Sequence, residues 1–171
     1  MNIGIYKKQV KEIDLNLIKP SRAGVILYTK IGNETYFGLG IDTGSKELTD
    51  FGGGISYKER DKDVILGALR EFKEETLGIF PTKVEDVLES LVIYNGQNLT
   101  IFKSIVVEDV EELCYLRHLF LKTHQKQSHA EVSDIVWMTM NEFKHAIMTR
   151  GKMFFRLQNF LQKAGNFYWL L

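Results

Sequence analysis

Short apolar runs with strand-like alternation recur along the chain and are separated by turn residues. The run after Pro20 and the run after the turn IGNE are rich in β-branched and aromatic residues, which predicts a hairpin. A second pair of such runs surrounds Gly96, and one more lies nearer the C-terminus. The expected strands are 23–31, 35–42, 87–95, 99–107 and 132–140.

Other stretches repeat apolar residues at three- and four-residue spacing, which is typical of amphipathic helices. The expected helices are 63–77, 109–123 (with a strand as its alternative) and 153–164. Gly78 is expected to stop the first of them, with Pro81 beyond it. A short helix is expected after the last strand, with Asn141 as its N-cap.

The order of these elements is strands, a glycine-containing loop, a helix, strands and further helices. It predicts an α/β fold with helices on both faces of the sheet, and it argues against a sequential parallel β-α repeat. The chain has two prolines and shows no repeat or low-complexity stretch. Since 171 residues suit one core, we expect a single domain over residues 1–171.

Composition excludes few functions, but it bears on the charge of the binding partners, on disulfides and on cellular location. Lys plus Arg and Asp plus Glu are both 22, so the net charge gives no support for bulk attraction to nucleic acid or membranes; a local basic groove stays open. The one cysteine, Cys114, excludes an internal disulfide and a cysteine-rich zinc site, and we expect it to be packed. The first residues carry no long apolar run, so we expect a cytoplasmic protein without a membrane anchor.

The segment REFKEETLG places three glutamates on one turn of the first expected helix: Glu71, Glu74 and Glu75. Like charges at these spacings cost a helix roughly 0.2–0.5 kcal/mol per pair. Either neighbouring basic residues and solvent offset that cost, or a divalent metal does. Gly67, one turn earlier, has two explanations as well: an open approach to a ligand, or close packing against bare backbone.

A glycine loop, Gly52–Gly54, precedes this helix and could bring backbone oxygens close to it. Mg²⁺ binds oxygen ligands and typically takes one or two carboxylates plus waters and substrate phosphates. The loop and the carboxylates are each weak signals. In this order and at this distance they indicate a metal site.

The stretch GGGISYKERDKDVILGALREFKEETLGI resembles a Nudix box and is the catalytic box expected at about 53–79. Gly53, five residues and Glu59 match its opening, and Arg70, Glu71, Phe72, Glu74, Glu75, Gly78 and Ile79 match the rest. Two departures stand out: ten residues separate Glu59 from Arg70 where the motif has seven, and two residues, Thr76 and Leu77, precede Gly78 where it has one. An ungapped register from Arg70 puts Lys62 at the place of the first glutamate, with Asp61 and Asp63 beside it.

The resemblance implies a Nudix-like α/β/α sandwich around a mixed sheet and a Mg²⁺- or Mn²⁺-dependent pyrophosphohydrolase. Glu74 and Glu75 would be the main metal ligands, with Glu71 and the Gly53 carbonyl as further ones. Arg70 would hold the carboxylates in place through an ion pair, expected with Glu59 and alternatively with Asp61 or Asp63.

Further site residues are expected around this box. The general base would be Glu71 or, from a downstream loop, Glu131. Phe51 and Tyr57 flank the glycine loop and are candidates to stack on a base. The segment 108–130 is where substrate specificity is expected.

Such enzymes cleave the pyrophosphate of a nucleoside diphosphate linked to another moiety, so the expected partner is a small nucleotide-type substrate. Nucleotide sugars, dinucleotides, nucleoside triphosphates, capped RNA and diphosphoinositol phosphates all stay open, as does a homodimer. The alternative is a catalytically silent module that binds a nucleotide or a partner. The intact central block favours the enzyme.

Overall fold

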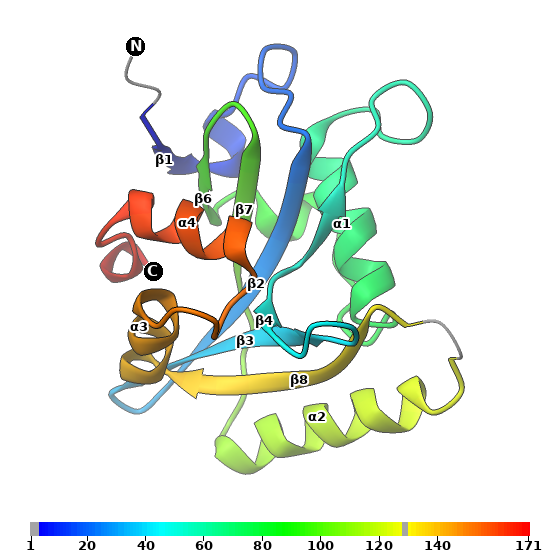
Figure 1. The fold of residues 1–171 in the computed structure, drawn as a ribbon, viewed down its shortest axis with the longest axis vertical. Helices are drawn as coiled ribbons and strands as arrows, with labels where there is room; N and C mark the ends of the chain where they lie inside the picture. Colours follow the sequence, from blue (N-terminus) through cyan, green and yellow to red (C-terminus); the bar gives the residue numbers. More distant parts are fainter. Residues whose placement is uncertain (1–3, 128–129) are drawn as a thin grey trace.

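The computed structural model describes residues 4–127 and 130–171. Its eight strands form one mixed sheet in the order β1-β6-β7-β2-β3-β4, with β5 paired to β2 and β8 paired to β3 (Figure 1). The strands are β1 (Tyr6–Gln9), β2 (Arg22–Ile31), β3 (Glu34–Asp42), β4 (Leu48–Thr49), β5 (Phe51–Gly54), β6 (Leu91–Tyr94), β7 (Asn98–Ser104) and β8 (Val132–Thr139). Only β2 and β7 pair in parallel among these described strands.

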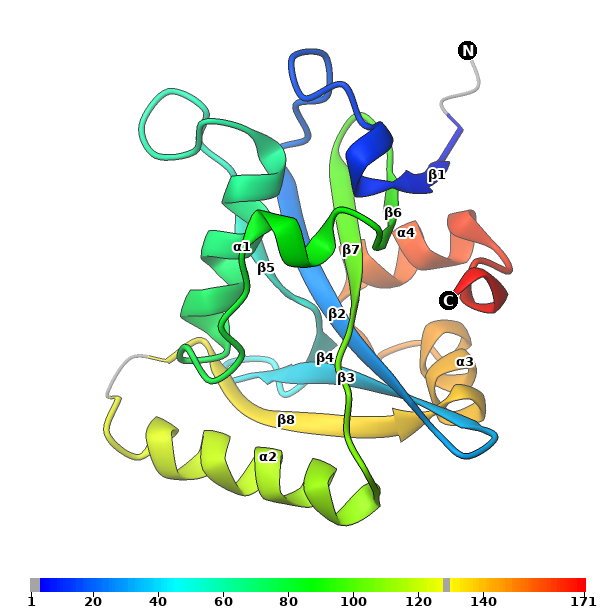
Figure 2. The same cartoon turned by 180° about the vertical axis from the view of Figure 1, so that it is seen from behind.

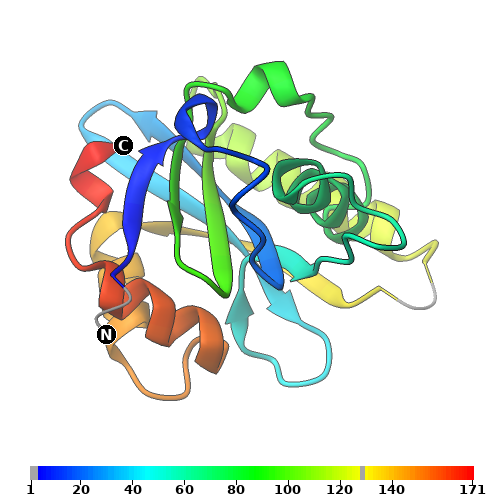
Figure 3. The ribbon, with the colours of Figure 1, turned by 90° about the horizontal axis from the view of Figure 1, so that it is seen from above.

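Helices cover both faces of the sheet, which confirms the expected α/β architecture. Viewed from above, α1 (Val64–Glu75) and α4 (Phe155–Ala164) lie on opposite sides of β2 and β7 (Figure 3). The helix α2 (Val110–His124) packs against β8, and α3 (Met140–Met148) packs against α4 (Figure 2). Three short 3₁₀ turns complete the described fold: Val10–Glu12, Val84–Val87 and Tyr168–Leu170.

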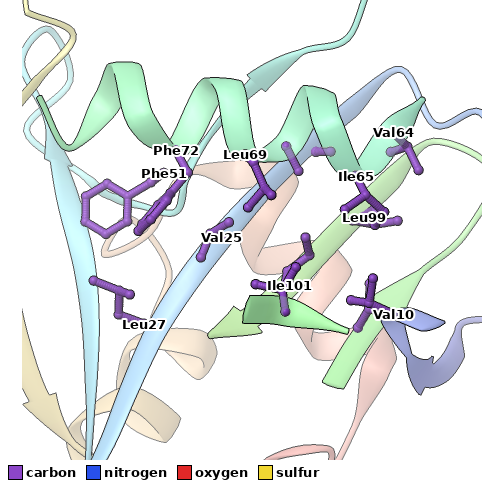
Figure 4. Packing of buried hydrophobic residues seen from close by; sticks show 14 of the residues in the cluster. Val10, Val25, Leu27, Phe51, Val64, Ile65, Leu69, Phe72, Leu99 and Ile101 are labelled. Atoms are coloured by element: carbon purple, nitrogen blue, oxygen red, sulfur yellow. The ribbon is translucent and has the colours of Figure 1, made fainter. Parts of the chain in front are cut away.

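Each face of the sheet has its own hydrophobic cluster because successive residues of a strand point to opposite faces. On β2, Val25 and Leu27 pack toward α1, whereas Ile26 packs toward α3 and α4. The cluster beneath α1 is drawn in Figure 4, where Ile65, Leu69 and Phe72 point from the helix into the core. The amphipathic character expected of this helix is therefore confirmed.

Several expectations need correction. The stretch expected to be a loop before the first helix contains β4 and β5, and β1 was not expected. Residues 87–90 lie outside β6, which begins at Leu91. The N-cap of α3 is Thr139, whose hydroxyl accepts from Glu142 N at 3.2 Å, so Asn141 lies inside the helix. Cys114 is exposed on α2 and is not a packed thiol.

No helix in the described ranges is long and apolar enough to cross a membrane.

Candidate functional site

The position of α1 is set at both of its ends. Asp63 caps its start, because the carboxylate accepts from Leu66 N at 2.9 Å. At its other end Leu77 and Gly78 both have left-handed backbone, with φ of 57° and 76°, and Gly78 N donates to Lys73 O at 2.9 Å. Gly78 thus stops the helix as predicted, and the extra residue before it is taken up in this left-handed turn. The carboxylate face of α1 is therefore held at a fixed height over β5.

The strand β5 is held to β2 by backbone contact. Arg22 pairs with Gly54 and Gly24 with Gly52. A Cβ at Gly52 would lie 2.7 Å from the Cα of Gly24, and one at Gly24 would lie 2.7 Å from the Cα of Gly52. Only glycines allow the two strands to pair in this way, which explains why a glycine run forms a strand here.

Gly53 has a different role, which concerns Glu71. A Cβ at Gly53 would lie 2.6 Å from both Cδ and Oε2 of Glu71. The carboxylate of Glu71 therefore occupies the space that a side chain would take. Glycine at this position lets the backbone of β5 and a carboxylate of α1 approach each other directly, as the glycine-loop prediction required.

Arg70 joins the carboxylates of α1 to the preceding loop. Its Nε donates to Asp61 Oδ1 at 2.7 Å and its Nη2 to Asp61 Oδ2 at 2.9 Å, a bidentate pair. Its Nη1 donates to Glu71 at 3.1 Å and to Glu74 at 3.3 Å. The Asp61 bonds and the neighbouring Glu71 raise the pKa of the Arg70 guanidinium above its usual range, against the opposing effect of burial. The hydrogen bonds from Arg70 hold the pKa of Asp61 below its usual value, although burial opposes them.

The expected pairing of Arg70 with Glu59 is therefore wrong, and Asp61 is the partner. The loop folds back on itself: Asp61 N donates to Ser56 O at 2.8 Å, and Ser56 N donates to Asp61 Oδ2 at 2.9 Å. This turn points Asp61 inward, where its side chain is 1% exposed, and leaves Glu59 on the exposed outer side. Asp63, the other alternative, caps α1.

A pocket of about 510 Å³ opens over the carboxylate face of α1. Three glutamates of α1 and one from the loop before β8 line it, together with glycines of β5. The lining comprises Gly53, Gly54, Arg60, Glu71, Glu74, Glu75, Leu77, Gln127, Ala130 and Glu131. The structure thus brings Glu131 to the box glutamates, although 56 positions separate it from Glu75 along the chain.

The proximity of these carboxylates perturbs their protonation. The pKa of Glu75 is raised to about 8. The largest cause is burial, followed by the charges of Glu131, Glu71 and Asp50 and a hydrogen bond with Glu131. Burial also raises the pKa of Glu71, and Arg70 partly counteracts it. Glu71 and Glu75 are each 8% exposed, whereas Glu74 has a side chain that is 58% exposed. Carboxylates this close together, two of them with a raised pKa, are suited to binding a cation.

The donor set fits a hard divalent cation in kind, since carboxylate and backbone oxygens are the ligands that Mg²⁺ and Mn²⁺ take. Within the described residues, however, no three acidic, histidine or cysteine side chains converge as a ready metal cluster. Arg70 instead engages Glu71 and Glu74 in ion pairs. Glu74, the most exposed of the three box glutamates, is the one freest to turn toward an ion.

The two aromatic candidates do not lie in this pocket. Phe51 is fully buried and packs edge-on against Phe72, with ring centroids 5.9 Å apart, so its predicted role in base stacking is wrong. Tyr57 is partly buried, donates its hydroxyl to Pro20 O at 2.6 Å and has Lys19 over its ring, and it is absent from the pocket lining.

Gly67 packs closely against the loop and does not give open access. A Cβ there would lie 2.8 Å from Ile55 Cδ1 and 3.1 Å from Asp61 Cγ.

Of the segment 108–130, Gln127 and Ala130 reach the pocket, whereas residues 128 and 129, including His129, lie outside the described residues. Arg60 lines the pocket and donates to Gly54 O at 3.4 Å, but sequence reasoning did not identify it as a site residue. The only feature of the sequence that could have indicated it is its place in the longer spacing between Glu59 and Arg70.

No family model matches the sequence, and no curated protein matches it. Solved structures do match. A C. elegans Ap4A hydrolase in a binary complex is 17% identical, with 88% of this chain and 98% of that chain covered and a TM-score of 0.49. The NUDIX domain of Shewanella oneidensis NrtR complexed with ADP ribose is 14% identical, with 90% and 94% covered and a TM-score of 0.44.

A second C. elegans Ap4A hydrolase structure is 16% identical, with 86% and 96% covered and a TM-score of 0.45. At these identities and TM-scores the matches say nothing of what this chain binds or cleaves. The ligand and the reaction therefore have to be inferred from the residues of the pocket.

Proposed function

We propose that the chain is a Mg²⁺- or Mn²⁺-dependent pyrophosphohydrolase of the Nudix kind, acting on a nucleoside diphosphate linked to another moiety. One observation carries the proposal: four glutamates from two distant parts of the sequence line a single pocket beside a strand whose glycine makes room for one of them. An acidic helix that served only solubility would not need this close approach, nor an arginine of the helix paired with a buried aspartate of the preceding loop.

Glu71, Glu74, Glu75 and the Gly53 carbonyl would hold the metal. When bound, it would neutralise phosphoryl oxygens and lower the pKa of a water. Arg70 positions two of these carboxylates, and Asp61 positions Arg70. Phosphoryl transfer depends chiefly on such positioning and on neutralisation of charge, so a rigid carboxylate face suits it.

Two residues are candidates to accept the proton of the attacking water. Glu131 is exposed at the pocket and is not held by Arg70. Glu71 is close to Gly53 and is engaged by Arg70. Replacement of the true base should flatten the alkaline-rising limb of the pH–rate profile, which distinguishes the two.

The proposal is tested with a panel of pyrophosphate substrates in Mg²⁺ or Mn²⁺: ADP-ribose and other nucleotide sugars, dinucleotides, nucleoside triphosphates, capped RNA and a diphosphoinositol phosphate. Products are identified by mass and by released phosphate. We expect turnover on at least one class, its loss in EDTA and its return with added metal. Binding of a nucleotide at micromolar affinity without product, in wild-type protein with metal present, would overturn the enzyme and favour the silent binding module.

A further inference from the structure

A second pocket, of about 440 Å³, lies on the opposite face of the sheet from α1. It is bounded by α4, the start of β2 and the turn between β6 and β7. Its lining comprises Ser21, Arg22, Asn95, Gln97, Asn98, Phe155, Arg156, Asn159, Phe160 and Lys163. None of these residues belongs to the carboxylate site.

The charge of this second pocket is opposite to that of the first. Three of its ten lining residues are cations and none is acidic, whereas four glutamates and one arginine line the carboxylate pocket. Arg22 is already neutralised by Asp50, with hydrogen bonds of 3.0 and 2.5 Å. The net positive charge of the second pocket therefore comes from Arg156 and Lys163. Neither forms an ion pair with another of the described residues.

The cations of α4 lie on the face of the helix that borders this pocket. Arg156, Asn159 and Lys163 follow one another at three- and four-residue spacing, so they share a face of the helix. The opposite face packs into the core through Leu157, Leu161 and Ala164. The two cations are exposed and can reach a ligand without breaking a contact that the fold depends on.

Amide groups complete the lining. Asn95 is used within its own turn, where its Oδ1 accepts from Gln97 N at 2.9 Å and from Asn98 N at 2.8 Å. The side chains of Asn98 and Asn159 make no hydrogen bond to another described residue. Cations beside uncommitted amide donors are a favourable environment for phosphate oxygens.

The two pockets lie on opposite faces of the sheet, and both include residues of the strand pair formed by β2 and β5. Arg22, at the second pocket, is the register partner of Gly54, which lines the first. Residues opposite each other in an antiparallel pair have Cα atoms about 4.5–5.5 Å apart. Among the described strands β5 pairs only with β2, so its other edge is open. A substrate that extends beyond the linkage held over the glutamates would pass around this edge to reach the cationic pocket on the opposite face.

We propose that this cationic pocket binds a second phosphate of the substrate, one that does not belong to the linkage that is cleaved. The inference rests on the proposed hydrolase function and narrows its substrates to phosphate esters that also contain a pyrophosphate linkage. Arg156 and Lys163 are then residues of specificity: they select the substrate, and the glutamates act on it.

A binding experiment tests the pocket without relying on activity. Inorganic pyrophosphate is titrated into metal-free protein, and backbone and side-chain amide signals are followed by NMR. We expect the signals of Asn98 and Asn159 to shift in the wild type, and the double variant Arg156→Gln with Lys163→Gln to bind at least about tenfold more weakly. The double variant Lys30→Gln with Lys122→Gln is the matched control and should bind as the wild type does. It removes two exposed charges outside this lining, one eight residues along β2 from Arg22 and one on α2, which packs against β8.

Kinetics then test the role in specificity. Coenzyme A and dephospho-coenzyme A, or NADPH and NADH, differ by one phosphate outside the pyrophosphate. We expect the Arg156→Gln with Lys163→Gln variant to raise KM about tenfold for the member with the extra phosphate, with kcat unchanged, and to spare the other member.

The results separate the two proposals. If pyrophosphate shifts no signal around Asn98 and Asn159, or if the variant and the wild type bind it alike, the anion pocket is refuted. If binding is lost in the variant but KM for both members changes equally, the assignment to substrate is refuted. If the wild type cleaves no member of either pair and none of the broader panel, the hydrolase proposal fails, while the titration still decides whether the pocket binds phosphate.

Discussion

The ion pair between Arg70 and Asp61 gives the sharpest test of the site's construction. Asp61→Asn keeps the size of the side chain and an oxygen for Ser56 N, but it removes the charge that Arg70 binds. Loss of one partner from a buried pair costs about 3–5 kcal/mol. Arg70 is 21% exposed and retains Glu71 and Glu74, so solvent and these partners compensate in part. We therefore expect a loss of about 2–3 kcal/mol in the free energy of unfolding.

Urea unfolding at pH 7 measures this loss, and Glu59→Gln is the matched control because Glu59 is exposed in the same turn, two positions before Asp61. That control should stay within about 0.5 kcal/mol of the wild type. A double-mutant cycle with Arg70→Gln should give a coupling of at least about 1 kcal/mol at Asp61 and little at Glu59. The reasoning is refuted if Asp61→Asn unfolds at the wild-type urea midpoint, or if the larger coupling is found at Glu59.

The same pair has a definite dependence on pH. Because Arg70 lowers the pKa of Asp61 in the folded state, the stabilisation is present above the ordinary value of 3.8 and is lost as the pH falls through the lower, folded-state pKa. The unfolding free energies of wild type and Asp61→Asn should therefore differ at neutral pH and converge in strong acid. A difference that persisted unchanged into acid would point to packing and not to charge.

Three further outcomes follow from the carboxylate pocket. Glu75→Gln should lower turnover on the best substrate at least about a hundredfold while the fold, followed by circular dichroism, persists; wild-type turnover at limiting Mg²⁺ would contradict the metal assignment. Because the pKa of Glu75 is raised to about 8, its contribution to the stability of the metal-free protein should be full below the ordinary value of 4.5 and be lost as the pH rises toward 8, and Mn²⁺ should raise the melting temperature more at pH 8 than at pH 6; an equal shift at both pH values would show that Glu75 does not release its proton to the metal. Gly53→Ala should weaken Mn²⁺ binding, measured by calorimetry, at least about tenfold because its Cβ would displace the Glu71 carboxylate, whereas Gly54→Ala, whose Cβ meets nothing within 4 Å, should bind as the wild type does.

Much of the fold could be predicted from the sequence because its main elements carry their own periodicity. Apolar spacing indicates both the strand that begins at Arg22 and the helix after Asp63, and an aspartate suited to capping precedes the helix. The strand β5 carries no such signal, since a run of glycines has neither β propensity nor side chains to pack. It forms because Gly52 and Gly24 let two backbones meet, a fact that belongs to a pair of distant residues and cannot be seen in either segment alone.

The error at Glu59 has the same origin. Counting along a motif treats the residues between the glycine loop and the helix as a linear spacer, and a glutamate at the expected interval is then the natural partner of Arg70. The loop is not linear: two hydrogen bonds between Ser56 and Asp61 close it into a turn, and the residue at the end of the turn faces the helix. An aspartate suits that place because its short side chain meets the guanidinium directly, at 2.7 and 2.9 Å. The three additional residues of the spacer thus leave the clamp of the carboxylate face intact and move its anchor from one acid to another.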